Sequence, residues 1–200
     1  MNGRKTDLEL RAGLPDHLRE LARLFPREGW SAHANFGPLT QFWLERHAVF
    51  RKLMAQLHAD AHACADREID PIRYAPRLSR FGGLFVGQLH EHHHVEDDHY
   101  FPILAARERA LQRGFDLLDA DHHAIAGTLD AFTRDANAVL TSAGAPATQG
   151  TLPDEAALAG QAARFAETLE RFDRLLVRHL EDEEEIIVPV LLKHGEDGFY

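Results

Sequence analysis

The sequence predicts an all-α fold, an antiparallel four-helix bundle with an N-terminal helical extension. Apolar residues recur at three- and four-residue spacing over long stretches, and no stretch shows a competing strand pattern. The two halves of the chain also repeat one arrangement, in which a helix with one histidine precedes a helix that carries His-x-x-x-Glu. Two helical hairpins of this kind make a four-helix bundle with pseudo-twofold symmetry.

The chain is expected to divide into an extension and a bundle domain. Residues 1–40 would form the extension, with a helix over Pro15–Phe25, and residues 41–195 would form the bundle. The periodicity predicts the four bundle helices over Thr40–Asp66, Phe81–Phe101, Asp116–Leu140 and Gln161–Val188.

Prolines, glycines and small residues mark the expected connections. Arg67–Arg80, with two prolines, is expected to be a connection, and Thr141–Thr151 a flexible loop. Pro102 should kink or end its helix, because proline lacks an N–H and crowds the preceding turn. Further helical stretches are expected over Ile103–Arg113, closed by Gly114, and from Pro153, with a break at Gly160.

Composition argues against several classes of partner. A net charge of −10 disfavours nucleic acid and anionic membranes, and no apolar run approaches the ~20 residues that a membrane span needs. Met1–Leu10 is charged and does not resemble a signal peptide. The single cysteine, Cys64, excludes an internal disulfide and a cysteine-based metal site. These features favour a cytoplasmic protein, and the oligomeric state stays open.

The repeated motif carries the chemistry. His92 and Glu96 form one copy, His179 and Glu183 the other, and a proline follows each glutamate by six residues. Positions i and i+4 share one face of a helix, so each copy directs an imidazole and a carboxylate the same way. Nitrogen and oxygen ligands on facing helices suit first-row transition metals, iron in particular. The alternative for a single copy is a solvated charged face.

Apolar flanks favour the metal hypothesis over the solvated face. Phe85 and Leu89 precede the first motif by seven and three residues, and Phe172 and Leu176 precede the second. The ligand pairs therefore continue buried faces, where unpartnered polar groups are costly. Beside the ligands, Phe50, Leu89, Ile125 and Leu176 are expected to be buried.

Two further histidines complete the candidate set. His47 and His122 each have apolar residues at +3, +7 and +10, which places both on core-facing stripes. Four imidazoles and two carboxylates exceed what one ion can use while keeping a reactive position, so we expect two ions, each with two histidines and both glutamates bridging. The predicted metal ligands are His47, His92, Glu96, His122, His179 and Glu183.

Several neighbouring polar residues are expected to lie outside this set. His93 and His94 fall off the stripe, and their counterparts in the second motif are not ligands. His123 fits the core less well than His122. The run Glu181–Glu185 is expected to be a mostly solvated acidic face, Glu183 excepted.

Other histidines keep open alternatives. His99 lies one turn beyond Glu96 and is an additional ligand, a group that contacts a ligand, or a packing residue. His58 and His62 form an i,i+4 pair that could bind a metal, with a plain surface pair as the alternative. His33 is expected to be structural or on the surface.

The motifs together resemble the hemerythrin-like family, also called the HHE cation-binding family. The resemblance covers roughly Leu44–Leu192 and rests on four motifs in order: His47-x-x-Phe50, His92-x-x-x-Glu96, Asp121-His122-x-x-Ile125 and His179-x-x-x-Glu183. It implies a four-helix bundle with a non-haem di-iron centre, oxo- or hydroxo-bridged, with zinc or manganese as alternatives. Activities in the family include oxygen binding and transport, nitric oxide chemistry, iron–sulfur centre repair and sensing.

The sequence departs from the oxygen-transport members of that family. Their third helix carries His-x-x-x-His, whereas Ala126 stands four residues after His122. Their fourth helix carries His-x-x-x-x-Asp, whereas Glu183 follows His179 by four. The set resembles the four-histidine, two-glutamate proteins linked to nitric oxide stress and iron-centre repair. One imidazole fewer implies an open metal position near Ala126.

Three functions follow as hypotheses. The first is a di-iron protein that binds O₂ or NO at the open position, as a sensor, scavenger or store. The second is a di-iron oxidoreductase, such as a nitric oxide reductase, an oxidase or an iron-centre repair protein, with a redox partner. The third is a closed structural or storage metal site.

Overall fold

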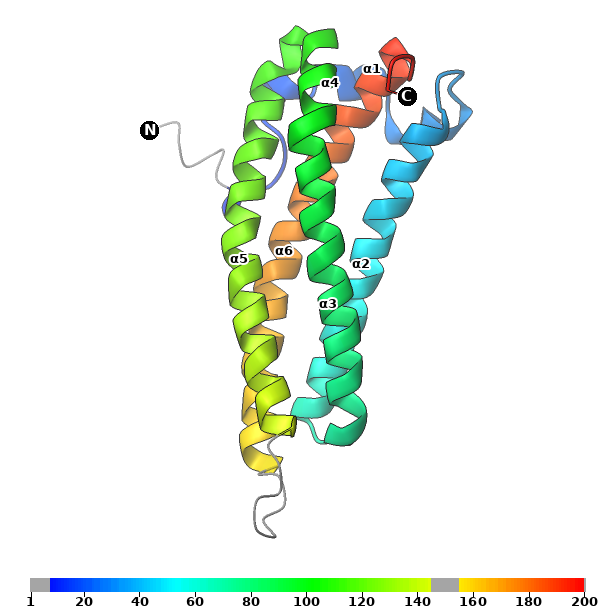
Figure 1. Cartoon of the computed structure of the whole chain (residues 1–200). Coiled ribbons are helices and arrows are strands. Elements are labelled where there is room, and N and C mark those ends of the chain that lie inside the picture. Colours follow the sequence, from blue (N-terminus) through cyan, green and yellow to red (C-terminus); the bar gives the residue numbers. More distant parts are fainter. Residues whose placement is uncertain (1–7, 145–154, 200) are drawn as a thin grey trace. The chain divides into compact units, whose positions relative to one another are not determined.

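The computed structural model describes residues 8–144 and 155–199, and within them the chain is helical without any β-strand (Figure 1). The all-α prediction is therefore confirmed. The α-helices are α1(Glu20–Leu24), α2(Pro38–Ala65), α3(Pro71–Val95), α4(Phe101–Arg107), α5(Gln112–Gly144) and α6(Glu155–His194). Among the described residues, no helix combines the length and apolar character that a membrane crossing requires.

The chain forms two compact units, and each long helix contributes to both. Unit 1 comprises Met1–Val49, Glu91–Ala124 and Leu175–Tyr200, and unit 2 comprises Phe50–His90 and Ile125–Arg174. The sequence-based division at residue 40 stays a prediction.

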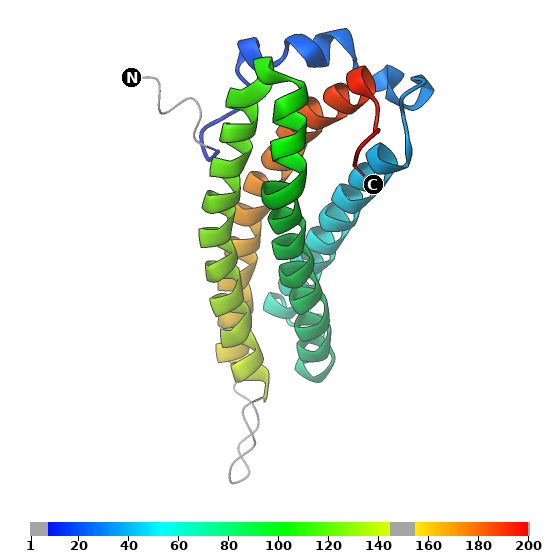
Figure 2. The same cartoon turned by 45° about the horizontal axis from the view of Figure 1, so that its top comes forward.

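In unit 1, the N-terminal segment packs against the C-terminal part of α6 (Figure 2). The amide of Asn35 donates to the carbonyl of Leu192 at 2.8 Å, and Trp30 packs against Val188 and Leu192. Glu196 accepts hydrogen bonds from the backbone N–H groups of Leu39 and Thr40 at 3.0 and 2.8 Å. This carboxylate satisfies N–H groups that a helix start leaves unpaired, and so fixes the beginning of α2.

Unit 2 has an apolar interior built around aromatic rings. The ring of Phe85 lies 6.3 Å from Phe50, 5.6 Å from Phe132 and 5.5 Å from Phe172, centroid to centroid. These separations are in the range that favours edge-to-face packing. Phe50, Leu89 and Ile125 of this unit are fully buried, as expected from the periodicity, and so is Leu176 of unit 1.

Several helices run further than the sequence suggests. Arg67–Arg80 is mostly helical, because α3 begins at Pro71, and Pro76 lies in its second turn, where proline removes a single hydrogen bond. Pro189 does not end α6, whose residues on both sides are fully buried, so packing outweighs the ~3 kcal/mol cost of proline. Gly160 lies inside α6 without a break.

Pro102 does interrupt its helix, but not where expected. α3 ends at Val95, a π-helical segment η4(Glu96–Tyr100) follows, and α4 then begins. A wider turn relieves the clash between the proline ring and the carbonyl four residues earlier. Glu96 stands at the start of this wider turn. The turn therefore sets the direction of a predicted ligand.

The segment between α4 and α5 also differs from the expectation. α4 ends at Arg107, and α5 begins at Gln112 after one 3₁₀ turn, so Gly114 lies inside α5 and closes nothing. A Cβ at Gly114 would lie 3.0 Å from Ile186 Cδ1, so glycine allows α5 and α6 to approach closely. Of the expected loop, residues 141–144 belong to α5, and residues 145–151 and Pro153 lie outside the described residues.

Candidate metal centre

The structure brings the six predicted ligands together inside unit 1. α2 and α3 each supply one histidine, η4 supplies Glu96, α5 supplies one histidine, and α6 supplies a histidine and a glutamate. All are buried except His92, which is 10% exposed at the side chain. The predicted residues are His47, His92, Glu96, His122, His179 and Glu183.

One donor group, here called the carboxylate group, consists of His47, His92, Glu96 and Glu183, whose ligand atoms lie within 4.8 Å of one another. His92 Nε2 lies 3.2 Å from His47 Nε2 and 3.0 Å from Glu96 Oε1. His47 Nε2 lies 3.3 Å from Glu183 Oε1. Two imidazoles and two carboxylates thus converge on one point.

A second group, here called the imidazole group, consists of His93, His122 and His179, with ligand atoms again within 4.8 Å. The other oxygens of the two glutamates reach it. Glu96 Oε2 lies 3.6 Å from His122 Nε2, and Glu183 Oε2 lies 3.3 Å from His179 Nε2. Each glutamate therefore offers one oxygen to each group.

His93 corrects an expectation, because it lies within the cluster. Its ring stacks on that of His122, with centroids 3.9 Å apart and planes at 9°, and its edge meets His179 at 5.4 Å. Consecutive helical residues differ by about 100° in direction, so a wide interior can receive both His92 and His93. The sequence signal that could have found it is the run of three histidines itself.

Unsatisfied buried atoms show that the site suits a cation. Both carboxylate oxygens of Glu96, the Nε2 atoms of His93, His122 and His179, and Oε2 of Glu183 have no hydrogen-bond partner of acceptable geometry. Such atoms are costly inside a protein unless something binds them. Ligand atoms bonded at about 2.1 Å and at right angles lie roughly 3 Å apart, close to the separations within the two groups.

Electrostatics at the site also favours a positive ion. Burial and the negative charge of Glu183 raise the pKa of Glu96 well above its usual range. Burial also acts to raise the pKa of Glu183, but His47 and His179 hold it well below its usual range. Two adjacent buried carboxylates repel each other, which favours the protonated form of Glu96. A bound cation would offset this repulsion.

The pKa values of two of the histidines shift in opposite directions. Burial lowers the pKa of His92 to about 3. Burial opposes the charge on His179 too, but the carboxylates of Asp121 and Glu183 outweigh it and raise its pKa to about 9. The two groups therefore begin from different protonation states.

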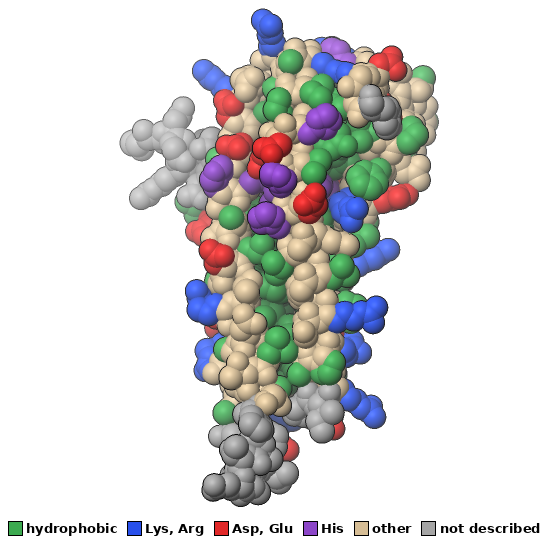
Figure 3. Space-filling view, in the orientation of Figure 1, with side chains coloured by type: hydrophobic (Ala, Val, Ile, Leu, Met, Phe, Trp, Pro, Cys, Tyr) green, Lys and Arg blue, Asp and Glu red, His purple; other side chains and the backbone are tan. Residues whose placement is uncertain are grey.

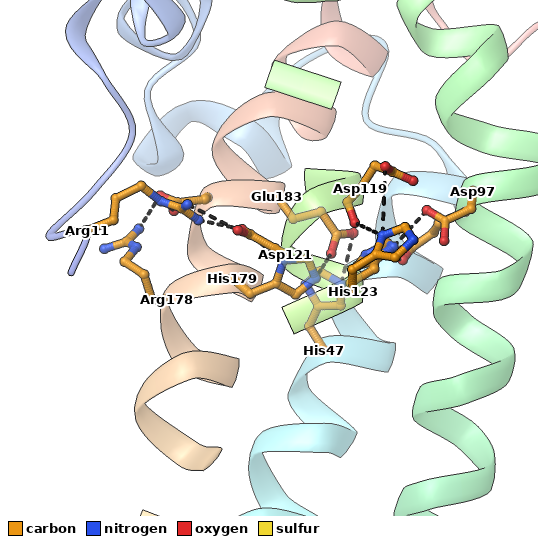
Figure 4. Close-up of polar contacts among 12 residues, drawn as sticks. Arg11, His47, Asp97, Asp119, Asp121, His123, Arg178, His179 and Glu183 are labelled. Carbon is orange, nitrogen blue, oxygen red and sulfur yellow. Dashed lines mark hydrogen bonds and ion pairs between the residues drawn. The ribbon is translucent and has the colours of Figure 1, made fainter. Parts of the chain in front are cut away.

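Carboxylates contact the outer nitrogen atoms of three of the rings. Figure 4 labels His47, His179, Asp97 and Asp121 among the residues involved. His47 Nδ1 lies 3.0 Å from Glu184 Oε1, and His122 Nδ1 lies 2.7 Å from Asp97 Oδ1. His179 Nδ1 lies 3.5 Å from Asp121 Oδ2. A carboxylate that takes the Nδ1 proton leaves Nε2 free to act as a ligand.

Arginines of the N-terminal segment support two of these carboxylates. Arg11, whose side chain is 1% exposed, donates from Nη1 to Asp121 at 3.1 Å and from Nε to Asp182 at 2.7 Å. Arg27 forms an ion pair with Glu184. The expectation of a mostly solvated run at Glu181–Glu185 is wrong, because Asp182 and Glu184 are buried and paired with these arginines.

The remaining candidates lie elsewhere. His99 is exposed, and so are His94 and His123, which pair with Asp98 and Asp119. Histidine and acidic side chains gather on the face shown in Figure 3. His33 is half-buried against the ring of Phe25, at 5.4 Å.

Ala126 overturns another expectation. It is exposed on α5, although His122 one turn earlier is buried at the edge of the interior. Four residues advance a helix by about 40° beyond a full turn, which here carries the side chain out of the buried face. A position next to Ala126 is therefore not part of the cluster.

Comparison with known proteins decides the family. The hemerythrin HHE cation binding domain matches residues 39–191. The chain belongs to this hemerythrin family. No curated protein and no solved structure matches the chain.

Membership of the hemerythrin family implies metal binding, typically of iron, and the two donor groups are candidate positions for it. Residues 8–38 of this hemerythrin-domain protein precede the matched region. Arg11 and Arg27, which contact carboxylates of the site, therefore lie outside the matched domain.

Proposed function

We propose that this hemerythrin-domain protein holds two iron ions and binds a small diatomic molecule, O₂ or NO, as a sensor, scavenger or store. One observation carries the proposal: two glutamates each offer one oxygen to each of two neighbouring donor groups. Such shared carboxylates are typical of sites for two ions in helical bundles. In this proposal α2, α3, α5 and α6 form an antiparallel four-helix bundle around the ions.

The donor count distinguishes the two positions. The imidazole group has three nitrogens and the carboxylate group has two, and both share Glu96 and Glu183. Five protein ligands nearly fill an octahedral iron site, whereas four leave room for an exchangeable molecule. We therefore place the open position at His47 and His92 instead of near Ala126.

Iron at these positions would supply a redox-active cation that binds O₂ or NO. The chain's own residues hold and shield it. Trp43 lies beside His92, with ring centroids 6.3 Å apart, and its indole N–H donates to Glu183. Tyr100 packs on Trp43 at 4.8 Å. These rings place apolar surface beside His92, where the diatomic molecule would bind, and so limit the access of water.

The negative net charge of −10 supports the further proposal that neither nucleic acid nor an anionic membrane is a partner. A cytoplasmic location is part of the same proposal.

The deciding experiment is metal analysis of protein purified without added metal, together with its visible spectrum before and after azide. We expect about two irons per chain and a spectrum that azide changes. His92→Ala should lower the iron content, and His94→Ala, an exposed histidine on the same helix, should not. Full occupancy by zinc with no response to azide would favour a closed structural site. Steady-state turnover with an electron donor would favour the oxidoreductase.

A further inference from the structure

Unit 2 carries a separate cluster of metal-ligating side chains. His58 and His62 lie one turn apart on α2, and Glu170 lies on α6. One ligand atom from each residue lies within 4.8 Å of the other two. None of the three belongs to the donor groups described above.

We propose that His58, His62 and Glu170 bind a divalent transition-metal ion, with Zn²⁺ as the ion that fits best. Two imidazoles and one carboxylate, completed by water, are a donor set that zinc adopts in proteins. The two histidines come from one helix and the carboxylate from another, so the ion would connect α2 to α6 in this unit.

The distances suit such an ion. Glu170 Oε1 lies 3.9 Å from His58 Nε2 and 3.8 Å from His62 Nε2. Both separations exceed a hydrogen bond. Ligand atoms bonded at about 2.1 Å in a tetrahedron lie roughly 3.4 Å apart, so small side-chain rotations would complete the geometry.

Exposure makes the site accessible. The side chains of His58, His62 and Glu170 are 33%, 47% and 49% exposed, so an ion can enter without opening the interior. The two imidazoles already face each other, with ring centroids 4.5 Å apart and planes at 62°.

The experiment titrates Zn²⁺ into the iron-loaded, full-length protein by calorimetry at a pH of about 8, because metal ligands bind in their deprotonated form. We expect one zinc ion per chain in addition to the iron. His62→Ala should weaken zinc binding by more than about tenfold, because losing a ligand should exceed the 10- to 100-fold cost of losing an outer partner. Glu170→Gln should weaken it less, because an amide oxygen remains.

The matched control is His94→Ala. His94 is also exposed and also has an i,i+4 partner, Asp98 at 3.4 Å. Among the described residues, however, no cluster of three metal-ligating side chains includes His94. It should leave zinc affinity unchanged. Iron content and thermal unfolding of each variant report on folding and on the iron centre separately.

Two results would overturn the proposal. One is the absence of zinc binding to the iron-loaded wild type. The other is unchanged zinc affinity in both His62→Ala and Glu170→Gln. Zinc binding that displaces iron and is unaffected by these variants would also overturn the proposal, because the zinc would then occupy the iron centre. Neither result bears on whether the buried centre holds iron, which metal analysis decides.

Discussion

The two donor groups share both glutamates, yet the protein supports them differently. Behind the imidazole group, Arg11 is buried and contacts Asp121, which contacts His179. Behind the carboxylate group, Arg27 is 56% exposed and contacts Glu184, which contacts His47. In both series of contacts, an arginine pairs with a carboxylate and the carboxylate contacts an imidazole. Because Arg11 is buried and Arg27 is exposed, we expect the contact of Arg11 to contribute more to the stability of the fold.

The largest expected effect follows from Arg11. Arg11→Ala would leave Asp121 and Asp182 buried with one cation fewer. Breaking a buried ion pair by removing one partner costs about 3–5 kcal/mol. Asp182 would keep its ion pair with Arg178 at 2.6 Å, so we expect most of this cost to arise at Asp121. Urea unfolding of the metal-free protein measures this free energy.

Arg19→Ala is the control, because Arg19 is 45% exposed and lies 3.3 Å from Glu185. An exposed pair of this kind contributes about 0–1 kcal/mol. If Arg11→Ala cost no more than Arg19→Ala, the buried arginine would have no structural role and the comparison would fail.

His93 gives the next effect. His93→Ala removes one nitrogen from the imidazole group, so metal affinity should fall on the order of tenfold or more while the carboxylate group keeps its ligands. Metal release to a chelator should then show one ion leaving early. His94→Ala should release metal as the wild type does. If His93→Ala released both ions at the wild-type rate, His93 would not be a metal ligand.

Arg27 should matter less than Arg11. Because its side chain is more than half exposed, water compensates part of the charge. We expect Arg27→Ala to lower the free energy of unfolding by about 1 kcal/mol, the upper end for exposed pairs. The loss should shrink at high salt, where exposed charges are screened. A loss equal to that of Arg11→Ala would contradict the role assigned to burial.

The sequence predicted the local part of this architecture. The i,i+4 motifs and their apolar flanks are read within one helix, so the six candidate ligands could be named before the fold was known. For the π-helical turn at Glu96, the sequence predicts only that Pro102 disturbs its helix. A proline indicates that the helix is interrupted, but not whether the helix ends, kinks or widens into a π-helical turn.

What the sequence could not predict depends on partners distant in the chain. The acidic run at Glu181–Glu185 looks solvated until Arg11 and Arg27 are known to reach it. The sequence places His93 outside the buried face of its helix, because the periodicity argument assumes that only a narrow face points into the interior. In the structure, the interior beside His122 is wide enough for a stacked pair of rings.

The smallest expected effect concerns the proton that His179 carries in the metal-free protein. In the metal-free protein the pKa of His179 is raised to about 9, so at pH 7 it carries a proton that metal binding must release. The pKa of His92 is lowered to about 3, so it is already neutral at pH 7 and releases none. Zinc binding in weak buffer, followed by an indicator dye, measures the release.

Asp121→Asn tests the cause of this release. It removes a carboxylate that holds the proton on His179, so fewer protons should be released at pH 7. Asp98→Asn is the control, because Asp98 is exposed and paired with His94. Equal release from all three proteins would mean that the proton comes from elsewhere. Lower release from Asp121→Asn alone would tie it to the carboxylate that Arg11 contacts, on the buried side of the centre.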